Sequence, residues 1–427
     1  MDPGEGASPE KGLREGWLVI VALGFTQIVG YGTLYYSYSM LAPAVAEELA
    51  WSQQWVFGVL SAALFASALL APLAGHWADR FGAGRLMVPG SAAAAAALLL
   101  CALAPGRIGF AAGVLAMELA SCFVLYSTAF VALVQLGGHG AQRSITHLTL
   151  IAGFASTLFW PFTALLAEHV SWREVLAVFA ALNLFLCLPV HAWIARRSPA
   201  GRSRVSEAAE PAEPVDSGGA RRPRRSGRPP VFLLMLAGFA VEGFVLSAVL
   251  VQMVPLLTAV GIGAGSVFVG TLFGPSQVAS RLVNMLFGRG VRQTWLALGA
   301  TGSLAAGLAV LLLTAPSVVG AVAFAILFGL GSGLMSIVGG TLPLELFGRQ
   351  AYGAHVGWIA AARQFSAAFA PFGFSLMAGA MGVLPALWVN VAVGLVGIAA
   401  FAVIAVAAAR GRDDAFVPDE ELRPESV

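Results

Sequence analysis

Four ionisable residues interrupt long apolar stretches of the sequence and are the first candidates for chemistry. They are Glu118, Glu242, Arg281 and Arg363. A charge at the centre of a lipid bilayer costs at least about 2.5 kcal/mol, so we expect such groups to bind a substrate or carry a proton. A carboxyl group in a partly dry cavity can load and release a proton near neutral pH. The alternative is a carboxyl group that stays neutral or pairs with an arginine and locks the helices together. The sequence does not decide between a Glu242–Arg363 and a Glu118–Arg281 pair.

A second group of polar residues lies on one face of the first apolar segment. Gln27, Tyr31, Tyr35 and Tyr38 follow one another at helical spacings, which places them on one side of a helix. The amide of Gln27 and the hydroxyls of Tyr31 and Tyr35 can bind a small polar anion while the rings exclude water. Tyr38 fits an aromatic residue at the membrane surface instead. Packing alone would also explain the stripe.

A third pair, Gln277 and Arg281, stands four residues apart on one helix face. We assign this pair to substrate binding together with Arg363, Gln27, Tyr31 and Tyr35. We assign Glu118 and Glu242 to proton coupling.

The composition decides which elements must position these residues. Of the 427 residues, 58% are hydrophobic and only 11% are charged, which excludes a water-soluble globule. About 20 apolar residues cross the roughly 30 Å of hydrocarbon as a helix, and the chain offers twelve such segments. The sequence therefore predicts an all-α integral membrane protein. The predicted spans cover residues 17–40, 53–74, 86–104, 108–135, 145–167 and 173–195 in the first half of the chain, and 231–258, 265–288, 293–314, 317–342, 353–379 and 383–409 in the second.

Three polar stretches frame these spans and divide the chain. Residues 1–16 and 410–427 are predicted to be tails, and the basic linker 196–229 a disordered tether between six-helix bundles at 17–195 and 230–409. Binding of anionic lipid headgroups is the alternative role of the linker. The segment Ser156–Phe162 aligns with Ser366–Phe372 between the two bundles. This repeat predicts two pseudo-symmetric halves with a substrate site at their interface.

The basic residues predict the orientation. If the N-terminus is cytoplasmic, 20 of the 24 Lys and Arg residues lie on the cytoplasmic side. The positive-inside rule then places both termini in the cytoplasm, and the protein in an inner or plasma membrane. The first span is too long for a cleavable signal peptide and follows an acidic leader. At about 1.5 Å per residue, Glu118, Glu242 and Arg363 lie near the midplane, and Arg281 lies about 10 Å from the cytoplasmic end of its span.

The loop after the second predicted span carries the most specific motif. A glycine at position 75 lets a neighbouring helix approach, and Gly82 permits a tight turn. Asp79 can accept hydrogen bonds from N–H groups at the start of an adjacent helix while pairing with a nearby arginine. The alternative is a solvated turn. The motif reads Gly75-His76-Trp77-Ala78-Asp79-Arg80-Phe81-Gly82-Ala83-Gly84-Arg85.

This motif resembles the cytoplasmic loop signature of the major facilitator superfamily. The resemblance implies twelve transmembrane helices in two six-helix halves, the major facilitator fold. It also implies a cytoplasmic gate formed by Gly75, Asp79, Arg80, Gly82 and Arg85. The central cavity of that fold is lined by the first, fourth, seventh and tenth helices, which would place Glu118 and Glu242 where substrate or protons pass.

Three shorter patches resemble the monocarboxylate transporters of that superfamily. In the fifth span, Arg143, Gly153, Ala155 and Ser156 resemble their basic-then-Gly-Ala-Ser signature in part. Glu15-Gly16-Trp17 resembles the acidic-Gly-Trp opening of their first helix. Gln277 and Arg281 stand where those proteins carry Asp and Arg, so the resemblance implies that Arg281 meets a substrate carboxylate. The aspartate is replaced here by Gln277, and the lysine of the first helix is missing.

No catalytic constellation, nucleotide-binding loop or metal-spaced His and Cys cluster is apparent in the sequence. We therefore expect no enzyme activity, no cofactor, no metal and no nucleic-acid partner. The function predicted is secondary transport of a small organic anion, with a monocarboxylate as the first candidate, coupled to protons by alternating access. Its partners would be the anionic substrate, protons and the lipid bilayer, with the protein acting as a monomer. The alternative is proton-antiport efflux of a drug or toxic small molecule.

Overall fold

The computed structural model describes residues 9–137, 140–198, 229–250, 252–288 and 290–413. Most of these residues are helical, and the described ranges contain no strand. The predicted linker 196–229 lies outside the described residues except at its two ends. The tails predicted at 1–16 and 410–427 fall outside them in large part.

The helices before the linker form one bundle, which we call the first bundle. Its elements are α1 (Pro9–Tyr31), the π-helix η1 (Gly32–Tyr36), α2 (Ser37–Glu48), α3 (Gln53–Phe81), α4 (Ala83–Ala102), α5 (Arg107–Val124), α6 (Tyr126–Leu136), α7 (Ala141–Ala152), α8 (Ala155–His169), α9 (Trp172–Leu182), the π-helix η3 (Asn183–Cys187) and α10 (Leu188–Arg197).

The helices after the linker form the second bundle. Its elements are α11 (Pro229–Leu250), α12 (Met253–Ala259), the 3₁₀-helix η4 (Gly263–Gly265), α13 (Ser266–Thr271), α14 (Phe273–Phe287), α15 (Gln293–Thr314), α16 (Val318–Phe347), α17 (Tyr352–Met381) and α18 (Val383–Asp413).

Ten helical segments are long and apolar enough to cross a membrane, against the twelve predicted. Two predicted spans are not among them within the described residues. The span predicted at 265–288 is divided into α13 and the 15-residue α14, and the span predicted at 353–379 forms α17, which carries His355, Arg363 and Gln364. The ten segments are Gly16–Glu48, Gln53–Phe81, Ala83–Ala102, Arg107–Leu136, Ala141–His169, Trp172–Arg197, Pro229–Leu250, Gln293–Thr314, Val318–Phe347 and Val383–Ala409.

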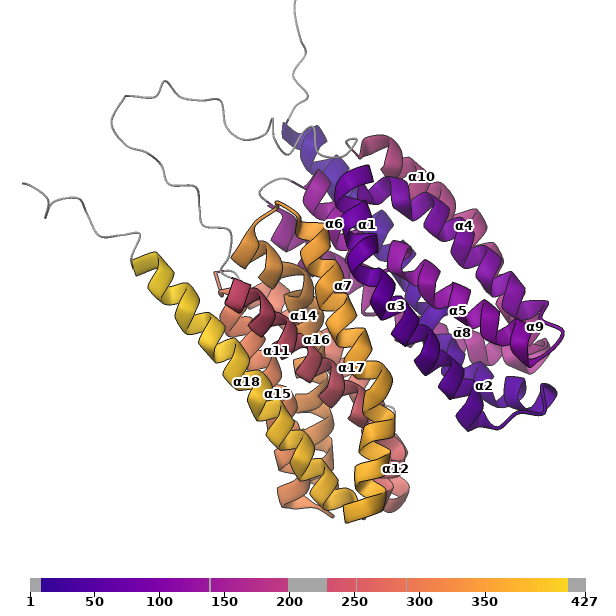
Figure 1. Ribbon diagram of the computed structural model, residues 1–427, viewed down its shortest axis with the longest axis vertical. Coiled ribbons are helices and arrows are strands. Elements are labelled where there is room, and N and C mark those ends of the chain that lie inside the picture. Colours follow the sequence, from indigo (N-terminus) through magenta and orange to yellow (C-terminus); the bar gives the residue numbers. More distant parts are fainter. Residues whose placement is uncertain (1–8, 138–139, 199–228, 251, 289, 414–427) are drawn as a thin grey trace, which may run out of the picture.

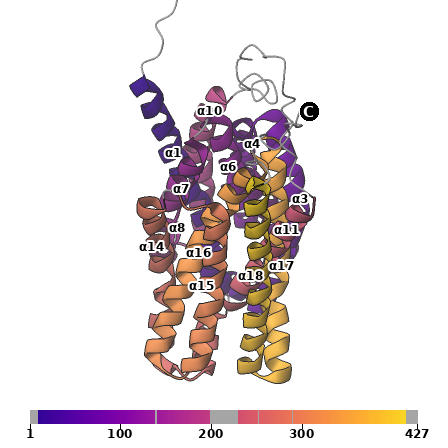
Figure 2. The same cartoon turned by 90° about the vertical axis from the view of Figure 1, so that its left-hand side faces the viewer.

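The two bundles lie side by side and contact each other at one end (Figures 1 and 2). Each has its own apolar core; Phe179 lies in the core of the first bundle and Phe324 in that of the second, both with no exposed surface. Contact between the bundles runs mainly along α3 and α17. We name the end of the molecule where they converge the Asp79 end, and the opposite end, where α2 and α12 lie apart in Figure 1, the Glu48 end.

Three irregularities shape the interior of the first bundle. Between α5 and α6, Leu125 takes an extended conformation, with φ −87° and ψ −169°, and breaks the predicted span at 108–135. The span predicted at 145–167 is interrupted at Gly153 and Phe154. In η1, the ring of Phe159 packs so closely on Gly32 that a Cβ there would lie 2.1 Å from it.

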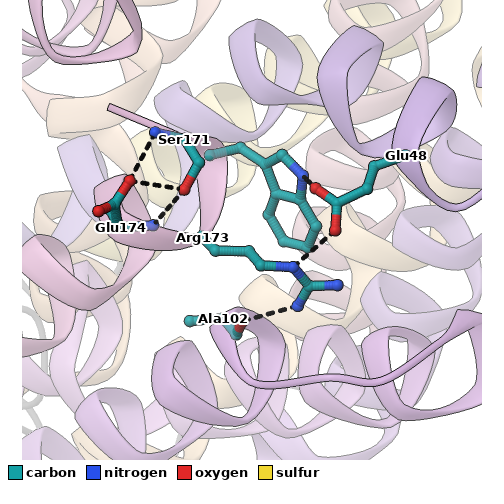
Figure 3. A network of polar contacts seen from close by, with 6 residues as sticks. Glu48, Ala102, Ser171, Arg173 and Glu174 are labelled. Atoms are coloured by element: carbon teal, nitrogen blue, oxygen red, sulfur yellow. Dashed lines mark hydrogen bonds and ion pairs between the residues drawn. The ribbon is translucent and has the colours of Figure 1, made fainter. Parts of the chain in front are cut away.

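A polar network fixes the first bundle at its Glu48 end (Figure 3). The carboxylate of Glu48 accepts hydrogen bonds from the Trp172 indole at 2.5 Å and from Arg173 Nε at 2.8 Å. Arg173 also donates to the carbonyl oxygen of Ala102 at 2.7 Å. The network therefore ties α2 to the start of α9 and the end of α4.

Candidate functional site

The two bundles are joined at the Asp79 end by the carboxylate of Asp79. Its Oδ1 accepts from the Gly353 N–H at 2.8 Å and its Oδ2 from the Ala354 N–H at 2.9 Å. Gly353 and Ala354 lie in the first turn of α17, whose N–H groups have no partner within the helix. The positive end of the helix dipole also favours the negative charge there. Asp79 of the first bundle thus caps a helix of the second.

The same contact brings backbone against backbone. A Cβ on Gly75 would lie 2.0 Å from the carbonyl oxygen of Gly353, and a Cβ on Gly357 would lie 2.5 Å from the carbonyl oxygen of Ala71. Any side chain at these positions would force α3 and α17 apart. Glycine is therefore required for the close approach of the two bundles.

The remaining motif residues hold the loop or face outward. Gly82 has a φ of 92°, which an L side chain rarely adopts, and ends α3. The side chains of Arg80 and Arg85 are exposed, and the Arg80 guanidinium lies 5.3 Å from the centre of the Phe81 ring.

The ion pair expected for Asp79 is not present among the described residues, which corrects that part of the sequence-based prediction. The backbone N–H groups of α17 take the place of the arginine.

The structure decides which buried acid and base pair. Arg363 Nε on α17 lies 2.8 Å from Glu242 Oε2 on α11, and its Nη2 donates to Oε1 at 3.2 Å. The Glu242 side chain is fully buried, whereas 31% of the Arg363 side chain is exposed. Of the two pairings that the sequence allowed, the structure contains Glu242–Arg363.

Arg281 makes a different set of contacts. Only 6% of the residue is exposed. Its Nε donates to Ser336 Oγ at 3.1 Å within the second bundle, and its Nη1 donates to the carbonyl oxygen of Thr149 in the first bundle at 3.1 Å. A Cβ on Gly153 would lie 2.4 Å from Nη1. Arg281 therefore bridges the bundles through a backbone carbonyl, next to the interruption between α7 and α8.

Glu118 and Gln277 lie apart from this bridge. Glu118 on α5 is 4% exposed, and no ion pair involves it in the part of the chain that the structure describes. Gln277 donates to Ser332 Oγ at 2.6 Å, which joins α14 to α16. Gln277 does not contact Arg281 by a hydrogen bond among the described residues, although the two share a helix face.

Gln27 makes a hydrogen bond to the backbone at a helix end. It is fully buried, and its Nε2 donates to the carbonyl oxygen of Val124 at 2.7 Å. Val124 is the last residue of α5, just before the break at Leu125. Gln27 therefore satisfies a carbonyl group at a helix end and sets where Tyr126 begins the next helix.

The two tyrosines predicted on the first span lie close together. The ring centroids of Tyr31 and Tyr35 are 6.4 Å apart. Tyr36 and Tyr126, which the sequence did not single out, join them: Tyr126 lies 4.6 Å and Tyr36 6.4 Å from Tyr31. The neighbouring Tyr35 and Tyr36 were a possible signal, but a regular helix would direct them to different faces.

A match over most of the chain decides the family. Residues 23–371 match the sequence profile of the Major Facilitator Superfamily. The chain belongs to the major facilitator superfamily. Members of this superfamily are membrane transporters of small molecules, so the chain is an integral membrane protein and a secondary transporter. No curated protein matches it in sequence.

Solved structures of superfamily members share the fold. The chain is similar to the human organic anion transporter MFSD10 (TETRAN), with a TM-score of 0.69 and 13% identity over 92% of this chain and 100% of that one. It is similar to the transporter FucP in the outward conformation, with a TM-score of 0.66 and 11% identity over 90% and 98%. The proton:xylose symporter XylE gives a TM-score of 0.64 and 13% identity over 90% and 95%. At these identities the likeness shows the fold alone.

The described residues also show which charged and polar groups lie between the bundles. In the described part of the chain, no group of three or more His, Cys, Asp or Glu residues could hold a metal ion. The polar groups near the contact between the bundles include the Glu242–Arg363 ion pair, the bridging residues Arg281 and Arg349, whose Nη2 donates to the Val134 carbonyl oxygen, and the hydrogen bond from Ser67 Oγ to Gln364 Oε1 at 3.1 Å.

Proposed function

We propose that the chain is a twelve-span secondary transporter that carries a small organic anion together with protons by alternating access. The Glu242–Arg363 pair carries this proposal. While Glu242 is ionised, its carboxylate neutralises Arg363 at 2.8 Å. Once Glu242 binds a proton, Arg363 is left as an exposed cation and can take the carboxylate of a substrate.

The coupling follows from competition for one guanidinium group. A substrate anion and the Glu242 carboxylate cannot both pair fully with Arg363, so anion binding favours protonation of Glu242. Two binding events that favour each other move together. The asymmetry of exposure supports these roles, because 31% of the arginine side chain is exposed and the carboxylate is fully buried.

The proposal assigns the Asp79 end to the gate. In this conformation Asp79, Gly75 and Arg281 all hold the bundles together at or near that end. We place Gly75, Asp79, Arg80, Gly82 and Arg85 on the cytoplasmic side, with both termini, because most basic residues of the chain fall on that side. We also propose that the protein lies in an inner or plasma membrane, acts as a monomer and has six spans in each bundle.

The residues nearest the substrate would be Arg363, Tyr31 and Tyr35. Gln27 and Gln277 would act by positioning, since both donate to fixed partners. Arg281 would act in closure, and it would become free to meet the anion when the bundles separate. A monocarboxylate is the simplest anion that one arginine can bind. The same fold serves organic anions in the protein named above as an organic anion transporter.

Uptake into proteoliposomes tests the proposal. We expect labelled lactate, pyruvate or phenylpyruvate to accumulate when the outside is acidified, and Arg363→Gln to abolish this accumulation. Glu242→Gln should retain exchange of the anion but lose the response to the pH gradient. If no carboxylate accumulates in the wild-type vesicles, or if Arg363→Gln transports normally, the proposal is wrong.

One observation favours the efflux alternative. Glu118 has no ion-pair partner among the described residues, so it could neutralise a cationic drug that exchanges for protons. Under that function, cells that produce the protein would tolerate lipophilic cations better than cells that produce Glu118→Gln. Unchanged tolerance would exclude it.

A further inference from the structure

Five aromatic rings gather in the first bundle. We call Tyr31, Tyr35, Tyr36, Tyr126 and Trp160 the aromatic cage. Ring centroids of Tyr35 and Tyr36 are 5.3 Å apart, those of Tyr31 and Tyr126 are 4.6 Å apart, and Trp160 lies 6.2 Å from Tyr36. Tyr31 of α1 and the rings of η1 are neighbours in sequence, whereas Tyr126 of α6 and Trp160 of α8 are distant from them.

Two irregularities of the backbone build the cage. The wide turn of η1 contains Tyr35 and Tyr36, and both rings contact Tyr31. A π-helix of this kind is frequent at functional sites. The break at Leu125, held by the bond from Gln27 to the Val124 carbonyl, starts α6 at Tyr126. The cage therefore depends on departures from regular helix, and the packing of a continuous helix would not need them.

Packing within the first bundle leaves part of the aromatic cage exposed. Tyr35 is 46% exposed and Trp160 is 49% exposed. Arg363 of the second bundle reaches the cage along α16: a Cβ on Gly339 would lie 3.9 Å from Arg363 Nη1. A Cβ on Gly340 would lie 2.7 Å from the ring of Phe130, which stacks on Tyr126 with ring centroids 5.1 Å apart. Gly339 and Gly340 therefore place Arg363 next to the Tyr126 side of the cage.

The charged residues beside the aromatic cage indicate which class of ligand it can bind. Such a cage binds cations, planar rings or sugars. A carboxylate that could hold a cation, Glu118, is only 4% exposed, whereas the Arg363 side chain is 31% exposed. The accessible charge beside the cage is therefore positive.

We infer that the substrate is an aromatic carboxylate, with its ring among the tyrosines of the cage and its carboxylate on Arg363. This inference rests on the proposed function and narrows it. It extends the site to Tyr36, Tyr126 and Trp160. Gln27 serves the same site as a positioning residue.

A matched pair of ligands tests whether the site prefers an aromatic ring to a saturated one. Benzoate and cyclohexanecarboxylate have one carboxylate and a six-membered ring each, both are ionised at neutral pH, and only benzoate is aromatic. Titration calorimetry of the purified full-length protein in detergent should give a dissociation constant about three- to tenfold lower for benzoate, the range expected of aromatic stacking. Tyr35→Leu and Trp160→Leu should each bring this ratio close to one.

Three controls distinguish the effect of losing an aromatic ring from the effect of losing the folded structure. Tyr35→Phe keeps the ring and should keep the ratio. Tyr38→Leu removes a ring from the same region, but Tyr38 donates to the Val56 carbonyl at 2.7 Å outside the cage, so the ratio should not change. Unchanged affinity of Tyr35→Leu for cyclohexanecarboxylate shows that the variant is folded.

The outcomes are distinct. If cyclohexanecarboxylate binds as tightly as benzoate to the wild type, the inference is wrong and the proposed function stands. If benzyltrimethylammonium binds and benzoate does not, the cage is a cation site and the inference is also wrong. If no carboxylate binds and none is taken up by vesicles, the proposed function itself is wrong.

Discussion

Arg363 Nε lies 2.8 Å from Glu242 Oε2, and the two partners differ sharply in their surroundings: the carboxylate is fully buried and the guanidinium is partly exposed. A pair of this kind is asymmetric in what it can do. The buried partner can change its charge by taking up a proton, while the exposed partner keeps its charge and can change its counterion. The following predictions depend on this relationship and on the contacts around it.

Replacement of Glu242 should remove the pH dependence of anion binding. In the wild type, acidification protonates Glu242 and frees Arg363, so benzoate affinity should rise as the pH falls, by at least about tenfold in total. Glu242→Gln should bind at all pH values as tightly as the acidified wild type, and Arg363→Gln weakly at all pH values. Calorimetry between pH 5 and 8 measures this. Glu345→Gln, which alters the Glu345–Arg292 pair at 3.9 Å, is the control. A pH profile of Glu242→Gln that follows the wild type would contradict the prediction.

Alanine at Gly353 should open the Asp79 end. Its Cβ would lie 2.5 Å from the Gly75 carbonyl oxygen, and such overpacking costs about 1–3 kcal/mol. Gly379→Ala on the same helix is the control, because nothing lies within 4 Å of a Cβ there. Spin labels at the exposed positions Trp55 and Leu376, toward the Glu48 end of α3 and α17, should move closer in Gly353→Ala only. Equal distances in both variants would mean that the contact does not control opening.

Loss of the Asp79 charge should weaken the same closure by a smaller amount. Asp79→Asn keeps one acceptor oxygen but presents an amide nitrogen to the second N–H group of α17. The loss of a capping carboxylate costs about 1 kcal/mol, which corresponds to a roughly fivefold shift toward the opened form. The label distances at Trp55 and Leu376 report this shift. Arg80→Ala, which removes an exposed side chain of the same motif, should leave the distance unchanged; a shift of equal size there would assign the effect to the loop and not to the cap.

Substitutions at Arg281 and Arg363 should have separate effects. Those at Arg281 should affect closure of the bundles, and those at Arg363 should affect anion binding. Arg281→Met removes the bond to the Thr149 carbonyl and should shift the label distances while leaving benzoate affinity within about twofold of the wild type. Arg363→Met should reduce benzoate affinity by at least about tenfold. Arg281→Lys tests the geometry, since a lysine ammonium cannot donate to Thr149 and Ser336 in the same arrangement. Loss of benzoate binding in Arg281→Met would show that Arg281 meets the substrate in this conformation.

The sequence could predict features that depend on composition or on short spacing. The apolar segments indicated a helical membrane protein, and the loop motif led to the superfamily that the profile match confirms. The N–H contacts of Asp79 were also expected, because a carboxylate beside a helix start has few better partners. Twelve spans were predicted, and ten helical segments of the described residues are long and apolar enough to cross a membrane. The segments with Arg281 and Arg363 are less apolar because they carry polar residues at the contact between the bundles.

Other features have no signature in a single sequence. Two acid–base pairings were open because their members lie at similar depths, and only the arrangement of α11 and α17 brings Glu242 to Arg363. The partner of Arg281 is a backbone carbonyl, which any residue at position 149 would offer. The turn of η1 depends on the ring of Phe159 against Gly32, a contact between residues far apart in the chain. The contribution of Tyr36 could therefore not be seen before the fold was known.

The glycine contact between α3 and α17 also affects which paths are open to protons. A Cβ at Gly75 would already lie 2.0 Å from the opposite backbone, so no water molecule fits between the helices at that point. A proton crosses a membrane protein along a file of hydrogen-bonded water, and such a file cannot be continuous where two backbones touch. The contact between α3 and α17 thus leaves no room for such a file between these two helices, and it needs no bulky side chain that would have to move at each turnover.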